Sequence, residues 1–264
     1  NILLGAGVVV LPFHHPIRVA EQAAMVDCLS GGRLLLGVGR GYQPHEFAGF
    51  GQTLDESQER YDQALAVLVR ALKDRDFSYD SGGIWRGERV TTWPNTVQES
   101  IPMWGAAISE ASFQRFGKLG WPVLSFPSST PPEKLKQQFD LYRETYLKEG
   151  HPSENMRIAA TMFTFVSRNA EEANLIFERA MGKYFGHLDG LTRSAEAEQR
   201  LYDRLPTTAR LSGSPSQVIK SLGEIRDYLG ITDVINVTHF AGDLTHEQTL
   251  ESIELFAREV IPAF

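Results

Sequence analysis

The sequence predicts a parallel α/β fold, and two observations indicate it. Six short segments are apolar on both alternating faces, which is typical of strands buried on both sides of a parallel sheet. Amphipathic helical patterns separate these segments along the chain. The expected strands are residues 2–11, 34–38, 102–107, 123–126, 157–166 and 233–240. An open doubly wound sheet and a closed barrel both fit this alternation, and both place their chemistry at the carboxyl ends of the strands.

Prolines and glycines mark the boundaries of these elements. Pro12 ends the first strand, Pro16 suits the first turn of a helix, and Gly31 with Gly32 ends that helix. Further helices are expected over residues 61–72, 112–119, 131–146, 171–185, 195–205, 215–229 and 250–260. Residues 77–101 are rich in turn residues and are expected to be an insertion that forms a hairpin. A second insertion is expected over residues 185–211.

Composition excludes several classes of protein. The 264 residues include 26 basic and 33 acidic side chains, a net charge of −7, which disfavours general binding to nucleic acids or anionic lipids. The single cysteine, Cys28, excludes an intrachain disulfide and a cysteine-based zinc site, and it lies on an apolar helix face as a packing residue. No signal peptide and no membrane span is visible. We expect a cytoplasmic protein whose residues 1–264 form one domain. Because Asn1 opens directly onto a strand pattern, residues are also expected upstream.

The loop after the second strand has a composition suited to binding an anion. It contains Gly37, Gly39, Arg40, Gly41 and Tyr42. The glycine spacing is not that of the dinucleotide fingerprint, and no P-loop lysine follows it. Glycines beside an arginine let a ligand approach the backbone while the guanidinium meets a phosphate. A structural ion pair is the alternative interpretation of this arginine.

Small hydroxyl residues follow the third strand. Ser109, Glu110 and Ser112 stand at the expected start of a helix. The two hydroxyls either cap the helix or accompany free N–H groups that bind a phosphate. Because neighbouring parallel strands end at the same edge of a sheet, we expect this segment and Arg40 to converge on one anion.

Three further polar side chains are candidates for a pocket. His14 lies in the turn after the first strand, Glu46 follows the arginine loop, and His239 follows the last strand. Each is either a pocket residue or an ordinary solvated or structural residue. A metal site is not expected, because the adjacent His14 and His15 diverge and no carboxylate cluster or H-E-x-x-H helix accompanies them. A serine triad is not expected either, because the Gly-x-Ser-x-Gly elbow is absent.

Residues 4–51 resemble the bacterial luciferase-like flavin-dependent monooxygenases. A valine-rich strand ending in Leu-Pro is followed by His-Pro-x-Arg-x-Ala-Glu, by Asp27, by Ser-Gly-Gly-Arg and by the Gly-x-Gly-Arg-Gly turn. The resemblance continues through residues 93–104, 109–122 and 213–218, and covers nearly the whole chain. It implies a (β/α)8 barrel, a TIM barrel, in which the six strands are the third to the eighth and the first two βα units are missing from this chain.

The resemblance also implies the roles of individual residues. It places a cis peptide bond at Gly7–Val8 beneath a flavin ring, and the flavin phosphate between Arg40 and the helix start at Ser109. Ile108 replaces a glutamate of the family. The residues implied in cofactor binding are Gly7, Val8, Arg40, Gly41, Ser109, Glu110 and Ser112. Glu46 and His14 are the catalytic candidates, and Tyr42, Phe126 and His239 are the implied residues of the substrate pocket.

The resemblance implies a two-component reaction. A separate flavin reductase supplies reduced FMN, and the bound flavin and O2 oxidise a small organic substrate while the protein excludes water. A deazaflavin-dependent dehydrogenase or reductase on the same fold is one alternative, a non-catalytic flavin-binding protein is a second, and a sugar-phosphate barrel enzyme is a third. A homodimer through the helix at residues 16–29 is also implied.

Overall fold

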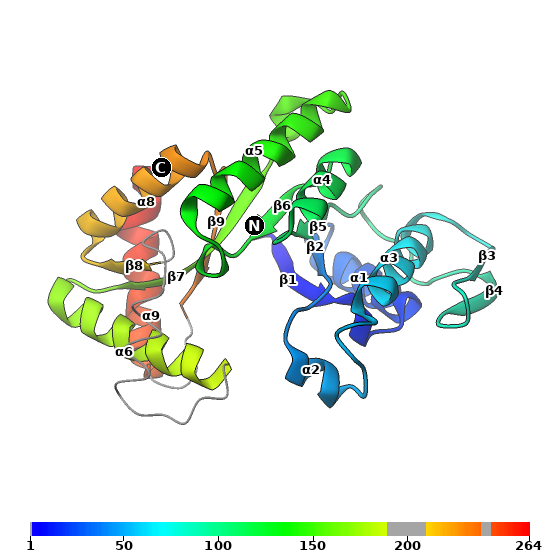
Figure 1. Ribbon diagram of the computed structural model, residues 1–264, viewed down its shortest axis with the longest axis horizontal. Helices are drawn as coiled ribbons and strands as arrows, with labels where there is room; N and C mark the ends of the chain where they lie inside the picture. The colour runs from blue at the N-terminus through cyan, green and yellow to red at the C-terminus, as the bar shows by residue number, and fades with distance from the viewer. Residues whose placement is uncertain (1, 189–209, 239–243) are drawn as a thin grey trace. The chain divides into compact units, whose positions relative to one another are not determined.

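The computed structural model describes residues 2–188, 210–238 and 244–264 (Figure 1). The chain divides into two compact units, Asn1–Ala107 and Ile108–Phe264, and each is described by itself. Both units contain parallel strands joined by helices, which confirms the predicted α/β class. None of the helices in the described parts of the chain has the length and apolar character that a membrane span requires.

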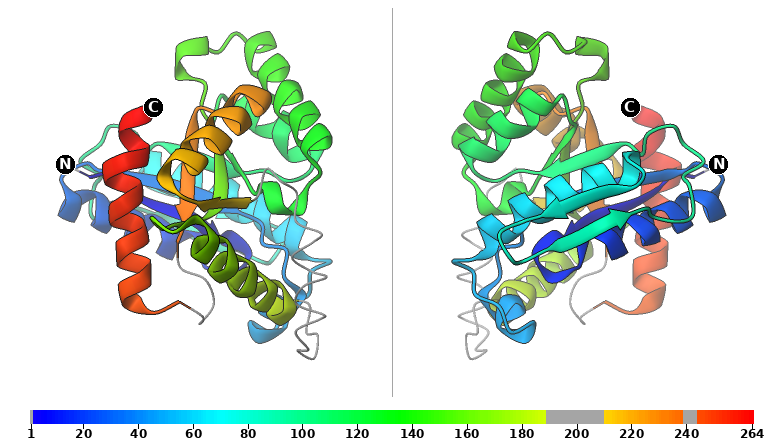
Figure 2. Two further views of the ribbon diagram at one scale, coloured as in Figure 1. Left: turned by 90° about the vertical axis from the view of Figure 1, so that its left-hand side faces the viewer. Right: turned by 90° about the vertical axis from the view of Figure 1, so that its right-hand side faces the viewer.

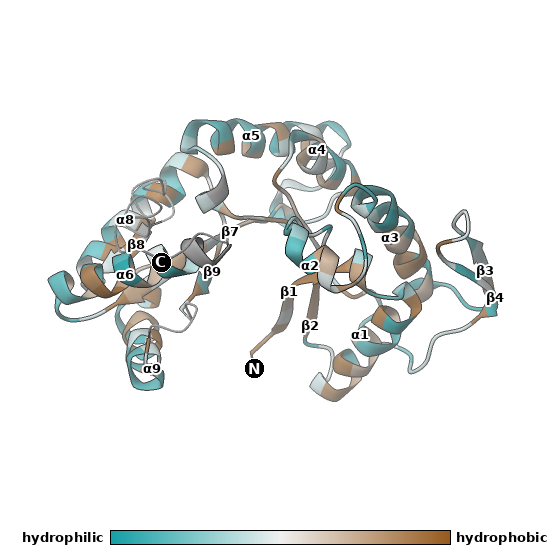
Figure 3. Cartoon of the chain, turned by 60° about the horizontal axis from the view of Figure 1, so that its bottom comes forward, coloured by the Kyte–Doolittle hydropathy of each residue, from teal (hydrophilic) through white to brown (hydrophobic). Residues whose placement is uncertain are grey.

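The first unit is built on three parallel strands in the order β1-β2-β5. The strands are β1 (Leu4–Val10), β2 (Leu34–Gly39) and β5 (Met103–Ala106), and all three were predicted. Hydrophobic residues dominate β2, as its brown colour in Figure 3 shows. The helices of this unit are α1 (Pro16–Ser30), α2 (Pro44–Gly49) and α3 (Ser57–Lys73). As predicted, α1 begins at Pro16 and ends at Gly31, which has a left-handed conformation.

Glycines on one face of β2 leave room for its neighbour β1. The pairing register shifts between Ala6 and Val9 of β1. A Cβ atom at Gly37 would lie 2.2 Å from the carbonyl oxygen of Ala6, so no side chain fits there. A Cβ atom at Gly39, the last residue of β2, would lie 2.7 Å from a methyl group of Val8, and one at Gly41, just beyond the strand, would lie 2.7 Å from a methyl group of Val10. The glycine-rich sequence therefore serves strand packing, because Val8 and Val10 cover this part of β2.

Asp27 joins α1 to the segment that leads into β5. Its carboxylate is completely buried and accepts hydrogen bonds from the backbone N–H groups of Val97 (2.7 Å) and Gln98 (3.0 Å). The Gln98 side chain donates a third hydrogen bond, at 2.7 Å. Burial acts to raise the pKa of Asp27, but the hydrogen bonds from Gln98 and Val97 outweigh it and lower the pKa below 3.8. Asp27 is one of the residues that carry the family resemblance, and these contacts give it a structural role.

The predicted insertion at residues 77–101 contains the expected hairpin. Its strands are β3 (Phe77–Asp80) and β4 (Arg86–Val90), paired antiparallel. Arginines at and beyond the end of α3 hold it in place beside that helix (Figure 2, right). Arg70 donates to the carbonyl of Ser78 at 2.9 Å, and Arg75 donates to the carbonyl of Thr92 at 2.8 Å.

The second unit has a parallel arrangement centred on one long strand. β7 (Ile158–Val166) pairs with β6 (Val123–Ser125) and with β9 (Asp233–Val237), as expected for consecutive barrel strands. β8 (Arg210–Gly213) pairs with the C-terminal part of β7 and was not predicted. Its four residues are too few to show a period, and they run directly into a helix.

Helices follow the strands of the second unit at the predicted places. They are α4 (Glu110–Leu119), α5 (Pro132–Lys148), α6 (Ala170–Leu188), α8 (Pro215–Leu229) and α9 (His246–Leu255). A buried core joins α6 to β7, where Phe163 and Phe165 pack with Phe177. The helix predicted over residues 195–205, most of the second predicted insertion and the end of the last predicted strand lie outside the described residues.

Candidate functional site

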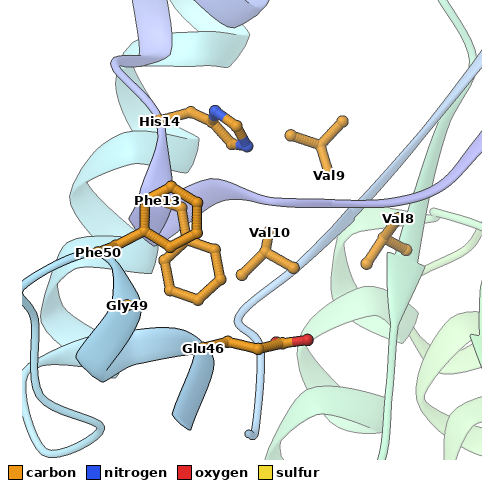
Figure 4. Close-up of a pocket in the computed structure, with 8 residues that line it drawn as sticks. All are labelled: Val8, Val9, Val10, Phe13, His14, Glu46, Gly49 and Phe50. Carbon is orange, nitrogen blue, oxygen red and sulfur yellow. The ribbon is translucent and has the colours of Figure 1, made fainter. Parts of the chain in front are cut away.

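A pocket of about 540 Å³ lies at the C-terminal end of β1, within the first unit (Figure 4). This volume is within the range of small-molecule sites, about 300–1,000 Å³. The residues that line it are Val8, Val9, Val10, Phe13, His14, Glu46, Gly49 and Phe50. The pocket therefore occupies the end of a strand, where the α/β pattern predicts a binding site.

Two short helical segments form the pocket. β1 continues into the single turn Leu11–Phe13, where the N–H of His14 donates to the carbonyl of Leu11 at 3.0 Å. The Gln52 side chain donates to the carbonyl of Pro12 at 2.9 Å and holds this turn against the chain that follows α2. Sequence reasoning did not predict the helix α2, because its six residues from Pro44 to Gly49 are too few to show a helical period.

Two phenylalanine rings, Phe13 and Phe50, make one end of the pocket aromatic, and a third packs behind them. Phe13 stacks on Phe50, with 4.5 Å between the ring centroids and 13° between the ring planes. The Phe13 ring also contacts the buried ring of Phe47, with 4.7 Å between the centroids and 67° between the planes. Sequence reasoning assigned no individual role to Phe13 or Phe50, although Phe13 lies in the same turn as His14 and Phe50 lies in the stretch that resembles the family. The available signal was the recurrence of phenylalanine at positions 13, 47 and 50 around a strand end.

The two predicted catalytic candidates both line this pocket. In Figure 4 His14 lies with Val9 on one side of the chain that leaves β1, and Glu46 lies with Val10 on the other. Within the described part of the chain, the Glu46 carboxylate has no ion pair and no hydrogen bond. Glu46 and His14 therefore do not form a hydrogen-bonded pair, and each faces its own part of the pocket.

Open space adjoins Gly7, next to the pocket residue Val8. The peptide bond between them is cis, as the resemblance implies. A Cβ atom at Gly7 would meet nothing within 4 Å, so the space above this residue is open. Val8 lines the pocket beside it. This space can accept a planar group, and its role in flavin binding stays a prediction.

Arg40 is available to an anion. Its guanidinium donates one hydrogen bond, from Nη1 to the hydroxyl of Ser57 at 2.7 Å. Ser57 is completely buried and is the first residue of α3. Among the described residues, no carboxylate forms an ion pair with Arg40, so the structural ion pair considered above is not found there. Gly41 follows it in a left-handed conformation, with φ of 80°.

Ser109 and Ser112 cap the helix α4. The N–H of Ser112 donates to the Ser109 hydroxyl at 3.3 Å, and the N–H of Ser109 donates to the Ser112 hydroxyl at 3.1 Å. No acceptor among the described residues takes the N–H groups of Glu110 and Ala111. These N–H groups at a helix N-terminus suit an anion. This helix start and Arg40 belong to different units, so their convergence stays a prediction.

The other predicted pocket residues have different surroundings. The side chain of Tyr42 is 50% exposed and is not among those that line the pocket. Phe126 packs in the second unit, where its ring lies 5.2 Å from that of Phe163 on the core between β7 and α6. His239 lies outside the described residues.

Comparison with known proteins identifies the family. Residues 1–233 match the family model described as luciferase-like monooxygenase, so the chain belongs to that family. Over 275 residues it is 27% identical to the Sinorhizobium fredii protein y4vJ, covering 100% of this chain and 78% of that protein. Over 285 residues it is 26% identical to the oxygenase component of the flavin-dependent trigonelline monooxygenase of Acinetobacter baylyi, covering 100% of this chain and 77% of that protein.

Solved structures have the same fold. The monooxygenase RslO1 from Streptomyces bottropensis aligns with a TM-score of 0.84 and 25% identity, over 99% of this chain and 78% of that one. The coenzyme F420-dependent tetrahydromethanopterin reductase from Methanopyrus kandleri aligns with a TM-score of 0.73 and 19% identity, over 100% of this chain and 84% of that one. The predicted family and the luciferase-like barrel fold are confirmed.

Proposed function

We propose that this protein is the oxygenase of a two-component flavin monooxygenase that uses reduced FMN and O2 to oxidise a small organic substrate. The observation that carries the proposal is the lining of the pocket at the end of β1. Its eight residues supply no hydroxyl, thiol or amine nucleophile. A bound cofactor that brings its own reactive group fits this lining, in which Glu46 and His14 are the side chains able to donate or accept a proton. Reduced flavin, when bound, supplies the activation of O2 and the transfer of oxygen.

The residues of this chain fit a flavin mononucleotide. Open space above Gly7 and the apolar side chain of Val8 suit a planar ring system. The guanidinium of Arg40 suits a phosphate, because a charged arginine forms strong hydrogen bonds to phosphate oxygens. The N–H groups of Glu110 and Ala111 are further donors for the same anion.

The protein's own contribution to the reaction is to keep the pocket dry. Val8, Val10 and Phe13 present hydrocarbon surface at the end of β1. Exclusion of water strengthens the electrostatic interactions within a site and suppresses side reactions of reactive species. Glu46 is the charged side chain of the pocket, where it accepts a hydrogen bond from substrate.

A deazaflavin-dependent reductase is the second candidate function. It is favoured by the full-length similarity in fold to an F420-dependent reductase. Deazaflavins transfer hydride, so this function requires the same ring and phosphate sites but no reaction with oxygen.

A paired titration distinguishes the two functions. The full chain is titrated without oxygen, first with reduced FMN and then with reduced deazaflavin coenzyme, and each complex is then mixed with O2 under stopped flow. We expect tight binding of reduced FMN and an oxygen-dependent absorbance change of the bound flavin. Preference for the deazaflavin without reaction with O2 would establish the second candidate, and binding of neither coenzyme would contradict both.

The variant Arg40→Gln tests the phosphate site. We expect it to weaken the binding of reduced FMN about 10- to 100-fold, because hydrogen bonds to a charged group contribute about 1.5–3 kcal/mol. The control is Arg86→Gln, which alters an exposed arginine of the hairpin. Equal binding by wild type and Arg40→Gln would remove Arg40 from the site.

The proposal includes a homodimer and a separate cytoplasmic reductase. The surface of α1 presents exposed apolar side chains, among them Met25 and Leu29. Apolar surface of this kind marks interfaces. Sedimentation velocity should show a dimer for wild type and a monomer for Leu29→Glu. The control Leu175→Glu, at another exposed leucine on α6, should remain dimeric.

A further inference from the structure

Building on the proposed function, we infer that Glu46 makes the enzyme selective for the charge of its substrate. The pocket accepts a largely apolar molecule that carries a hydrogen-bond donor, a hydroxyl or a protonated amine. It rejects carboxylates and sulfonates of the same size.

The apolar lining determines the body of the substrate. Valine side chains from β1 and the phenylalanine wall supply most of the pocket surface. In Figure 4 Val8 and Val10 lie on the same side of the chain as Glu46, so a substrate that reaches this exposed carboxylate also contacts hydrocarbon. A molecule gains affinity there by burying apolar area. A strongly hydrated molecule gains little.

The charge of the pocket determines the polar group of the substrate. Glu46 is the one carboxylate among the eight lining residues, and none of those residues is lysine or arginine. An ionised carboxylate only accepts hydrogen bonds, so its matching partner is an O–H or N–H donor. An anion in this pocket would meet the Glu46 carboxylate, and like charges at close range disfavour binding. His14, the other titratable lining residue, lies on the opposite side of the chain that leaves β1.

The Phe13–Phe50 pair contributes to binding independently of the Glu46 charge. Phe50 is 58% exposed but keeps its ring parallel to that of Phe13, so the pair presents a flat apolar surface. Removing the Phe50 ring should weaken all apolar ligands alike, whatever their charge. Removing the Glu46 charge should change only the ranking by charge.

Four probes with one octyl chain test the inference by calorimetry on the full chain at fixed salt concentration. They are octanol, octylamine, octanoate and octanesulfonate. We expect octanol and octylamine to bind at least about tenfold more tightly than the two anions, since juxtaposed like charges are strongly unfavourable. In Glu46→Gln the difference between octanol and the anions should fall to about twofold or less, because the repulsion is lost.

Two further variants control for general effects. Glu59→Gln removes a carboxylate on α3 that bonds to Gln63, and it should keep the wild-type ranking. Phe50→Ala should weaken all four probes by a similar factor. Tight binding of octanoate by wild type, an unchanged ranking in Glu46→Gln, or no binding of any probe would each overturn the inference.

The probe titrations contain no flavin, so they are independent of the test of the proposed function. If the probes show the expected ranking by charge but bound reduced FMN does not react with O2, the proposed monooxygenase function is contradicted and the selectivity stands. Reaction of reduced FMN with O2 without the ranking would support the monooxygenase and overturn the selectivity.

Discussion

Asp27 shows how one buried carboxylate fixes two segments that are 70 residues apart. We expect Asp27→Asn to lower the free energy of unfolding by about 1–3 kcal/mol, because the amide oxygen can accept from the two backbone N–H groups but the amide NH2 would then face the Gln98 side-chain donor and leave it unsatisfied. Urea unfolding measures this. The control Asp227→Asn removes an exposed ion pair and should change little. Equal effects of the two substitutions would contradict the role of Asp27.

The lowered pKa of Asp27 also predicts a pH dependence. Its carboxylate has a lower pKa in the folded chain than the ordinary value of 3.8, so ionisation favours the folded state. This contribution is fully present above pH 3.8 and is lost as the pH falls through the folded-state pKa. The stability difference between wild type and Asp27→Asn should therefore be constant near neutral pH and shrink in acid. Urea titrations at several pH values measure it, and a difference that grows in acid would contradict the assignment.

At the scale of residues, the sequence was informative wherever polar groups follow strands. His14 and Glu46 were predicted from their places after strand ends and from the family resemblance, and both line the pocket. Phe50 lies in the stretch that resembles the family, but no pocket role was predicted for it, because the six residues of α2 before it are too few to leave a periodic pattern. The glycines around Arg40 were interpreted as room for a ligand, and a Cβ atom at Gly39 or Gly41 would lie 2.7 Å from a valine methyl group. Sequence alone cannot show which neighbour fills the space beside a glycine.

At the scale of elements, two helix glycines predict opposite effects of the same substitution. A Cβ atom at Gly117 of α4 would lie 2.9 Å from the Thr145 Cβ of α5, whereas one at Gly223 of α8 would meet nothing within 4 Å. Gly117→Ala should lower the free energy of unfolding by about 1–3 kcal/mol through overpacking, more than the gain in helix propensity of about 1 kcal/mol. Gly223→Ala should raise it by about 0.5–1 kcal/mol.

Thermal or urea unfolding of the two alanine variants measures the difference. Each changes one hydrogen to a methyl group in a helix interior, so each is the control for the other. Changes of the same sign would show that α4 and α5 can separate to admit the methyl group.

The predictability of elements follows their length. The strand β7 spans nine residues that are apolar on both faces, and its pattern was unambiguous. The four residues of β8 contain a serine and a glycine, so they could not be told from the start of the helix that follows. The hairpin was predicted from its turn residues, but its place beside α3 was not, since the arginines that anchor it act across the chain.

At the scale of the whole molecule, the residues assigned to the flavin phosphate are divided between the two units. Arg40 belongs to the first, and the free N–H groups of Glu110 and Ala111 belong to the second. A ligand that binds only the folded state stabilises it, by about 2.7 kcal/mol at a concentration about 100 times its Kd. For a chain of this size that corresponds to a rise in Tm of about 5–10 °C.

Shared binding of one phosphate predicts more than a rise in Tm. FMN should protect backbone amides from hydrogen exchange in both residues 37–42 and residues 108–112, because one anion would hold both segments. Riboflavin has the same ring and no phosphate, so it should protect neither segment to the same degree. In Arg40→Gln the protection should fall in both segments together, since each depends on the bound ligand. Protection confined to one segment would show that the two strand ends do not converge on one anion, and the phosphate site would then be assigned to that segment alone.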